Sequence, residues 1–225
     1  MVSIRPPSIE APLSIREQVE RELAALIVSG ELEPGTMVSV PTLAAQFEVS
    51  ATPVREAILE LERRGFVVAV KNKGFRITEV SDEELAHLVD TRLLLELPAV
   101  ASLAKDFPTE ELPGLTAIAE EIVASAAAGD LRAYLEADLR FHLYLLRLYG
   151  NTILSEIVAD LRSRTRLTGL RTLLETDRLA ASAVEHLELL GLLERGDVEG
   201  VRELMRRHIG HVRGWWAGRP EESTE

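Results

Sequence analysis

The chain of 225 residues contains no cysteine, which excludes both a disulfide framework and a metal site with thiolate ligands. It also lacks any apolar run long enough to span a membrane, and its N-terminus has no apolar stretch of the kind that a signal peptide carries. We therefore expect a soluble cytoplasmic protein without a membrane partner. Hydrophobic residues make up 46% of the chain and charged residues 28%, which indicates one or two folded domains with a sizeable core.

Positive charge is scarce, because 25 lysine and arginine residues stand against 37 acidic ones and the net charge is −12. Such a balance would argue against nucleic-acid binding if it were evenly spread. Residues 51–76, however, hold six basic and three acidic side chains, a local excess of positive charge. Since binding to phosphate depends on the charge at the contact face, this segment remains a candidate for contact with DNA.

The basic stretch belongs to a predicted succession of three helices and a hairpin. Apolar residues recur at helical spacing over residues 15–29, 41–47 and 51–64, which predicts three helices. Two runs of β-branched and aromatic residues, 66–70 and 75–78, flank a short polar segment and predict a two-stranded hairpin. A helix-turn-helix followed by such a wing is a module that reads DNA.

The third predicted helix begins with groups that are suited to DNA. Ser50 is a good N-cap, Thr52 adds a hydroxyl for a phosphate contact, and a helix N-terminus itself favours phosphate. Arg55 lies one turn into the helix on its exposed side, from which a guanidinium reaches O6 and N7 of guanine. The alternative for Arg55 is a surface ion pair with Glu56 or Glu60.

Basic side chains of the predicted hairpin form a second set of DNA candidates. We assign Lys71, Lys73 and Arg76 to contacts with the DNA backbone or the minor groove beside the wing. The alternative is that they are solvated charges on an exposed hairpin.

Four short motifs lie along this part of the chain: Ser29-Gly30-Glu31-Leu32-Glu33-Pro34-Gly35, Leu43-Ala44, Val49-Ser50-x-Thr52-Pro53-Val54-Arg55-Glu56-Ala57 and Leu61-Glu62-x-x-Gly65. Together they resemble the winged helix-turn-helix of the GntR family of bacterial transcription regulators, over residues 12–80. Ala51 departs from the family, which usually has an arginine at this position. We therefore do not expect the family's usual operator preference, and we expect Arg55 to carry more of the recognition.

Everything after residue 80 is predicted to be helical. Ser81-Asp82-Glu83-Glu84 is typical of a capping box, and a long helix follows to about residue 105. Further helices are expected to begin at Thr109, Asp130 and Asn151, near Thr176, and at Asp197, the last of them ending near Trp216. The chain is thus predicted to be mainly α, with a winged helix-turn-helix over residues 1–80 and an all-α bundle of about six helices over residues 81–225.

Four side chains of the predicted bundle form a set that suits a metal ion. Asp138 and His142 are four residues apart, and they therefore leave the same face of a helix. His186 and His208 come from two later helices. One carboxylate and three imidazoles suit a divalent cation such as zinc, nickel or manganese. The residues alone leave open that each histidine lies at the surface or is satisfied within the core.

The bundle also carries the motifs Arg92-x-x-x-Glu96, Asp138-x-x-Phe141-His142, Glu185-His186, Gly196-Asp197 and Met205-x-x-His208-Ile209. They resemble the FCD-type effector domain of the FadR subfamily of GntR regulators, over residues 81–215. The resemblance implies that Asp138 and the three histidines hold a divalent cation, over which a small organic acid binds through a carboxylate. It also associates Arg92 with the effector cavity, where a guanidinium suits a carboxylate. The alternative for Arg92 is an ion pair with Glu96 on the same helix.

Two further groups of basic residues are given no part in the site. His211 lies three residues beyond His208, and we expect it to be solvated, with a position beside the metal ligands as the alternative. The arginines of the helix that follows Asn151 are likewise expected to be solvated, with a cavity-facing Arg162 or Arg166 as the alternative.

These predictions describe a dimeric, ligand-responsive repressor rather than an enzyme. The two winged modules of a homodimer bind the halves of a palindromic DNA operator, and a carboxylate effector bound beside the cation changes their spacing. One alternative is a regulator that senses the metal itself. Two others are a fatty-acyl sensor, which the metal ligands argue against, and a metal-dependent hydrolase, which would need a general base beside the cation.

Overall fold

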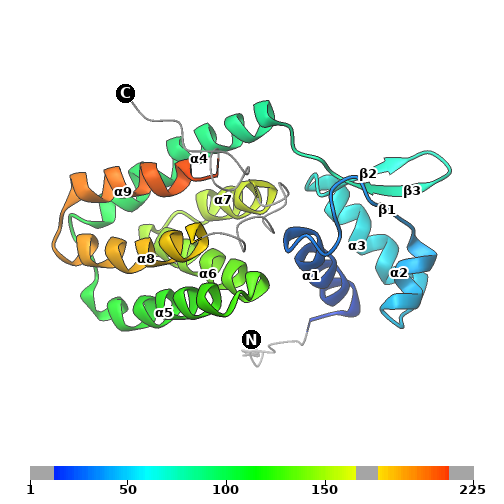
Figure 1. Cartoon of the computed structure of the whole chain (residues 1–225), viewed down its shortest axis with the longest axis horizontal. Coiled ribbons are helices and arrows are strands. Elements are labelled where there is room, and N and C mark those ends of the chain that lie inside the picture. The colour runs from blue at the N-terminus through cyan, green and yellow to red at the C-terminus, as the bar shows by residue number, and fades with distance from the viewer. Residues whose placement is uncertain (1–12, 166–176, 213–225) are drawn as a thin grey trace, which may run out of the picture.

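The computed structural model describes residues 13–165 and 177–212, and these residues are mainly helical (Figure 1). The N-terminal part, which we call the head (residues 13–80), combines helices with a small sheet. Its elements are α1 (Ile15–Val28), β1 (Met37–Val38), α2 (Val40–Gln46), α3 (Ala51–Arg63), β2 (Val67–Val70) and β3 (Gly74–Ile77).

Local sequence explains where the first and third helices begin and which faces they bury. Helix α1 begins at a complete capping box, in which the Ser14 hydroxyl accepts from the Glu17 amide and the Glu17 carboxylate accepts from the Ser14 amide at 2.8 Å. Helix α3 buries a stripe of apolar residues against α1 and α2. The stripe consists of Val54, Ala57, Ile58 and Leu61. The opposite face of α3 is therefore left to the solvent.

The wing is a three-stranded antiparallel sheet in the order β1-β3-β2. The predicted two-stranded hairpin corresponds to β2 and β3, and strand β1 was not predicted. Strand β1 has only two residues, too few for a sequence pattern to reveal. The pairing of β1 with β3 explains why residue 74, which has a φ of +111°, is a glycine. A Cβ at this position would lie 2.4 Å from the Val38 carbonyl oxygen, so glycine is required where β3 begins beside β1.

After residue 80, the described residues form a helical bundle. Its elements are α4 (Asp82–Leu103), the 3₁₀ turn η1 (Thr109–Glu111), α5 (Leu112–Ala128), α6 (Leu131–Tyr149), α7 (Thr152–Thr165), α8 (Arg178–Glu194) and α9 (Val198–Gly210). Helix α6 is central, because it packs against α4, α5 and α7, and its Tyr134 and Phe141 are completely buried. Side chains on the inward face of α6 are therefore removed from water.

The predicted fold class is confirmed: a winged helix-turn-helix precedes an all-α bundle. Asp130 and Asp197 cap α6 and α9 with their side chains, as expected. Thr109 instead begins a 3₁₀ turn, and α5 starts at Leu112, where Pro113 suits a first helical turn. The predicted end of the last helix near Trp216 lies outside the described residues. Within the described ranges, no helix is both long and apolar enough to cross a membrane.

The head and the bundle each have a hydrophobic core of their own. They meet where α1 and α3 face α6 and α7 (Figure 1). Between residues that the structure describes, two ion pairs cross this boundary: Arg132 to Glu22 at 2.7 Å, and Arg64 to Asp160 at 3.3 Å. The contact between the two parts is therefore partly polar.

Candidate functional site

The N-terminal end of α3 presents the side chains that were predicted to meet DNA. Ser50 occupies the N-cap position, but its hydroxyl makes no capping hydrogen bond to the helix. Thr52 and Arg55 are exposed on the first turns. Among the described residues no ion pair engages Arg55, because Glu60 pairs with Arg63 instead. The alternative surface ion pair of Arg55 is therefore absent.

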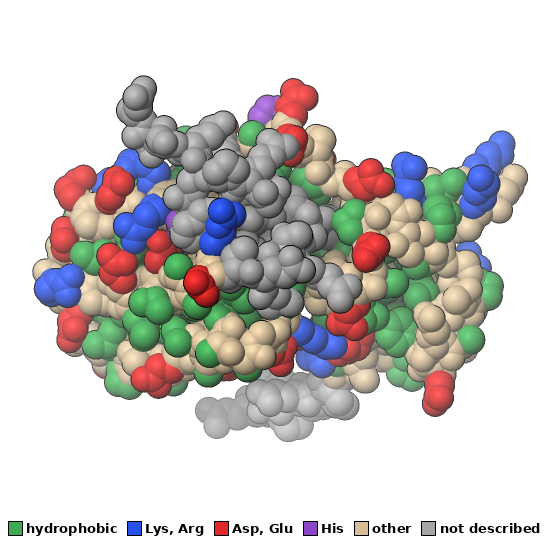
Figure 2. All heavy atoms as spheres, viewed as in Figure 1, with side chains coloured by type: hydrophobic (Ala, Val, Ile, Leu, Met, Phe, Trp, Pro, Cys, Tyr) green, Lys and Arg blue, Asp and Glu red, His purple; other side chains and the backbone are tan. Residues whose placement is uncertain are grey.

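The wing carries the other predicted DNA residues. Lys71 and Lys73 are exposed in the turn between β2 and β3, and Arg76 is exposed on β3. Figure 2 shows basic side chains standing at the end of this wing. The wing and the start of α3 thus offer two sets of polar and basic groups within the head, the arrangement in which a winged helix-turn-helix contacts DNA.

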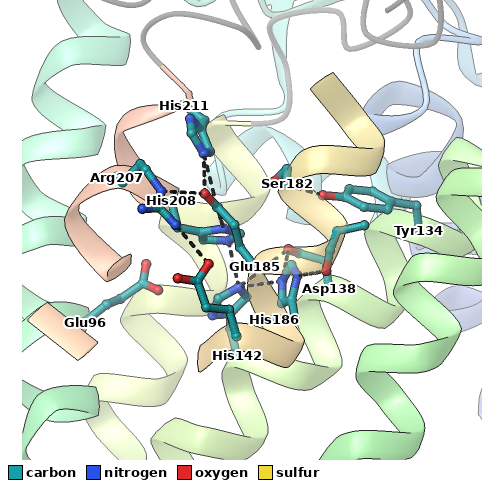
Figure 3. Close-up of polar contacts among 12 residues, drawn as sticks. Glu96, Tyr134, Asp138, His142, Ser182, Glu185, His186, Arg207, His208 and His211 are labelled. Atoms are coloured by element: carbon teal, nitrogen blue, oxygen red, sulfur yellow. Dashed lines mark hydrogen bonds and ion pairs between the residues drawn. The ribbon is translucent and has the colours of Figure 1, made fainter. Parts of the chain in front are cut away.

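Inside the bundle, the four predicted metal ligands converge from three helices (Figure 3). Asp138 and His142 share the inward face of α6, as their spacing predicted. His186 extends from α8 and His208 from α9. All four side chains are buried, and none is more than 6% exposed.

The ligand atoms of these four residues face one another. His142 Nε2 lies 3.2 Å from Nε2 of both His186 and His208. Asp138 Oδ1 lies 3.1 Å from His186 Nε2, and all four ligand atoms lie within 4.8 Å of one another. Nitrogen ligands that bind zinc tetrahedrally at about 2.0–2.1 Å are about 3.3–3.4 Å apart. The observed spacing therefore fits one cation among the four groups.

Hydrogen bonds at the Nδ1 atoms of two histidine rings fix which ring nitrogen is available to bind a metal. The Nδ1 of His186 donates to the Ala183 carbonyl oxygen at 3.0 Å, and the Nδ1 of His208 donates to Glu185 Oε2 at 2.8 Å. This assignment follows from the acceptors, and it leaves the Nε2 lone pairs pointing inward. Burial lowers the pKa of His208 to about 4 and lowers the pKa of His142 well below its ordinary value. Both rings are therefore neutral near pH 7, the form that binds a metal.

A chain of buried charges leads from Asp138 to α4. Arg162 donates from Nη1 to Asp138 Oδ2 at 3.4 Å and from Nε to Glu96 Oε2 at 2.9 Å. Arg92 donates from Nε to the other oxygen of Glu96 at 2.7 Å. Burial opposes the charge of Glu96, but Arg162 and Arg92 hold the pKa of this carboxyl below its usual range. Burial also lowers the pKa of Arg92, to about 10.

This network corrects one prediction and qualifies another. Arg162 was expected to be solvated, which is wrong: it is 2% exposed, because its side of α7 packs against α4 and α6. Arg92 makes the predicted alternative ion pair with Glu96, and its contact with an effector remains a prediction. Arg166 lies outside the described residues.

Glu185 and His211 join the site, although no role was predicted for Glu185 and a position beside the metal ligands was only the alternative for His211. Glu185 accepts from His208 Nδ1, from His211 Nε2 at 3.0 Å and from Arg207 Nε at 2.8 Å. Burial would raise the pKa of Glu185, but the hydrogen bonds from His208 and His211 lower it below its usual range. The expectation that His211 is solvated is wrong, since its side chain is 1% exposed and turned towards α8. The signal in the sequence that could have indicated this contact was the position of His211 three residues after His208, which makes the two side chains neighbours on one helix.

Comparison with known families agrees with this architecture. Residues 15–77 match the model of the bacterial regulatory proteins of the gntR family, and residues 87–211 match that of the FCD domain. The second match covers more than half of the chain. Both matched families agree with the motifs that the sequence analysis identified.

Curated relatives and solved structures carry names of transcription regulators. The HTH-type transcriptional regulator McbR of Escherichia coli is 30% identical over 205 residues, which is 88% of this chain and 92% of McbR. The HTH-type transcriptional repressor GlaR of the same organism is 27% identical, over 81% of this chain and 87% of GlaR. A solved structure of E. coli McbR/YncC matches with a TM-score of 0.77 and 27% identity, over 88% of this chain and 94% of that one. The chain belongs to the GntR family of transcription regulators, with a gntR DNA-binding domain followed by an FCD domain, and it is not an enzyme.

Proposed function

We propose that this protein is a metal-dependent repressor that responds to a small organic acid. The observation that carries the proposal is the convergence of one carboxylate and three imidazoles inside a domain that is joined to a DNA-reading head. Repression is supported by the relative GlaR, which is named a transcriptional repressor. The head binds one half of a palindromic operator, and a homodimer supplies the second head.

Asp138, His142, His186 and His208 are the residues that hold the cation. The set of three nitrogen ligands and one oxygen ligand suits Zn²⁺, Ni²⁺ or Mn²⁺. When bound, such a cation would accept a carboxylate oxygen only as a ligand in addition to these four, by expanding its coordination number. His208 and His186 are held for this task by the Nδ1 hydrogen bonds to Glu185 and to the Ala183 carbonyl oxygen.

The charges around the site favour an anionic effector. Asp138 and Glu96 are balanced by Arg92 and Arg162, so this buried group of four has no net charge. A divalent cation adds two positive charges that the group does not compensate. Burying unpaired charge is costly, and a carboxylate that binds beside the cation reduces this cost. The arginine Arg92 is the group we assign to the effector, because a guanidinium pairs with a carboxylate through two hydrogen bonds.

The proposal predicts that the cation and the acid act together on DNA affinity. A duplex that the protein selects from a random-sequence pool serves as the operator, and acetate, lactate, succinate and citrate are screened with Zn²⁺ by thermal shift. We expect one acid to weaken operator binding by about 5–150-fold in the presence of Zn²⁺. The same acid should have no effect on protein that has been stripped with a chelator.

Fluorescence anisotropy with the labelled duplex measures these affinities. If Zn²⁺ alone produced the whole change, the protein would be a sensor of the metal. If neither Zn²⁺ nor any acid changed the operator affinity, the proposed sensing function would be wrong.

The DNA-reading half of the proposal predicts a loss of specificity in Arg55→Ala. A bidentate contact between arginine and guanine is worth about 1–3 kcal/mol, so specific binding should weaken by about 5–150-fold. Arg55 is exposed and has no ion pair among the described residues, so the fold should be unaffected. Binding to a scrambled duplex should change little.

Lys71→Ala provides the matched comparison, because this exposed lysine is assigned to a phosphate. Its loss should weaken binding to the selected and the scrambled duplex alike, and it should reduce the salt slope of binding by about one. Unchanged affinity of Arg55→Ala for the selected duplex would contradict the assignment of α3 as the reading helix.

A further inference from the structure

The last two turns of α7 carry charged side chains that face two different parts of the molecule. Asp160 and Arg164 are four residues apart and share one face of the helix. Arg162 lies between them in sequence and points to the other side, into the bundle. Helix α7 therefore contacts the buried site with one face and the boundary to the head with the other.

On the head side, Asp160 contacts the end of the reading helix. Its Oδ1 accepts from Arg64 Nε at 3.3 Å, and Arg64 is the C-cap residue of α3. Arg64 also donates to Glu20 of α1 at 3.1 Å and lies over the Phe66 ring, with its guanidinium carbon 5.0 Å from the ring centre. A displacement of Asp160 would thus act on α3, on α1 and on Phe66, the residue before β2.

Arg164 extends this contact by one helical turn. Its Nε lies 3.6 Å from the point that a Cβ on Gly65 would occupy, so the guanidinium packs beside the residue that follows α3. Gly65 has a φ of +79°, which lets the chain turn sharply from α3 into the wing. Arg164 also pairs with Glu84 in the first turn of α4, where the chain enters the bundle.

On the bundle side, Arg162 contacts the site directly. Its Nη1 donates to Oδ2 of Asp138, whose Oδ1 faces His186 Nε2. Arg162 is 2% exposed and has Glu96 as its second partner, so it has little freedom to move independently of α7. A carboxylate that shares its charge with a cation holds a neighbouring guanidinium less strongly. Arg162 is thus a side chain of α7 that is in direct contact with Asp138.

We infer that α7 couples the buried site to the reading head, with Arg162 on the site and the pair Asp160 and Arg164 on the end of α3. This inference rests on the proposed function, because it concerns how occupation of that site changes operator affinity. A helix moves as a rigid unit, so a shift at Arg162 repositions Asp160 and Arg164 against Arg64 and Gly65. The reading helix is then reoriented without any direct contact between the site and DNA.

The test measures, for each variant, the operator affinity of stripped protein divided by the operator affinity of loaded protein. Loaded protein carries Zn²⁺ and the acid that most weakens operator binding in the wild type. In Asp160→Asn this ratio should fall by about 1.5- to 5-fold, the contribution of one partly exposed ion pair. Zn²⁺ affinity without DNA should stay at the wild-type value, because Asp160 touches none of the four ligands. Arg164→Gln should lower the ratio in the same way.

Glu22→Gln is the matched control, because the pair between Glu22 and Arg132 also joins the head to the bundle but does not involve α7. This variant should keep the wild-type ratio. By linkage, the selected duplex should change the Zn²⁺ affinity measured at a saturating concentration of the acid by the same factor as the loaded site changes DNA affinity, in every variant.

Each outcome decides the question. A wild-type ratio in both Asp160→Asn and Arg164→Gln would overturn the inference and leave the proposed function intact. Equal losses in Asp160→Asn and Glu22→Gln would also overturn it, because any contact between head and bundle would then serve. A ratio of one in the wild type would overturn the proposed function and this inference together.

Discussion

Replacing His186 by alanine is expected to abolish binding of Zn²⁺ to the bundle. The Nε2 of His186 faces both Asp138 Oδ1 and His142 Nε2, so the substitution removes one of the four ligands from the middle of the set. Loss of an outer partner of a metal site typically costs about 10–100-fold in affinity, and loss of a ligand itself should cost more. Isothermal titration of stripped protein with Zn²⁺ measures the change, and elemental analysis of the purified variant provides a second measure.

Two further variants serve as comparisons for the Zn²⁺ affinity of His186→Ala. Glu185→Gln keeps the shape of the side chain that orients His208 but removes its charge, and it should weaken Zn²⁺ binding by about 10–100-fold. His87→Ala removes an exposed histidine of α4 and should leave Zn²⁺ affinity unchanged. Wild-type Zn²⁺ content in His186→Ala would show that these four residues are not the metal site. In the folded variant, circular dichroism should report the same helix content as in the wild type.

Two of the four metal candidates could be placed together from sequence because their spacing is local, whereas His186 and His208 were joined to them through the resemblance to a known domain. The spacing of Asp138 and His142 places both on one face of α6 whatever the helix packs against. Helix starts such as that of α1 are equally local, since Ser14 and Glu17 satisfy each other within one turn. Fold class followed from the same periodicities, combined with the resemblance to known domains.

What the sequence did not reveal depends on contacts between distant segments. Arg162 and His211 look like ordinary surface residues of polar helices, and they are buried only because α7 and α9 pack beside α4 and α8. The role of Glu185 likewise requires α9 to lie beside α8. Strand β1 exists only because β3 offers it an edge, and two residues carry no pattern of their own. These features could not be predicted because they depend on burial between distant segments rather than on local propensity.

Glu96→Gln is expected to produce the largest loss of stability among these variants. Glu96 is 1% exposed and is the partner of two buried arginines, Arg92 and Arg162. Removing its charge leaves two guanidiniums with Asp138 as the one remaining carboxylate of this group, and breaking a buried pair in this way costs about 3–5 kcal/mol. Urea unfolding of stripped protein, followed by circular dichroism, measures the difference in the free energy of unfolding at pH 7.

The pH dependence and two comparisons test this cause. The pKa of Glu96 lies below its unfolded value of 4.5, so its contribution is present above that pH and is lost as the pH falls through the lower folded value. Wild type and Glu96→Gln should therefore differ fully at neutral pH and converge in acid. Glu136→Gln removes an exposed i,i+4 partner of Arg132 and should change stability little. Adding Arg92→Met to Glu96→Gln should recover part of the loss, because the uncompensated buried charge is then smaller. A double variant no more stable than Glu96→Gln would mean that the loss comes from packing rather than from charge.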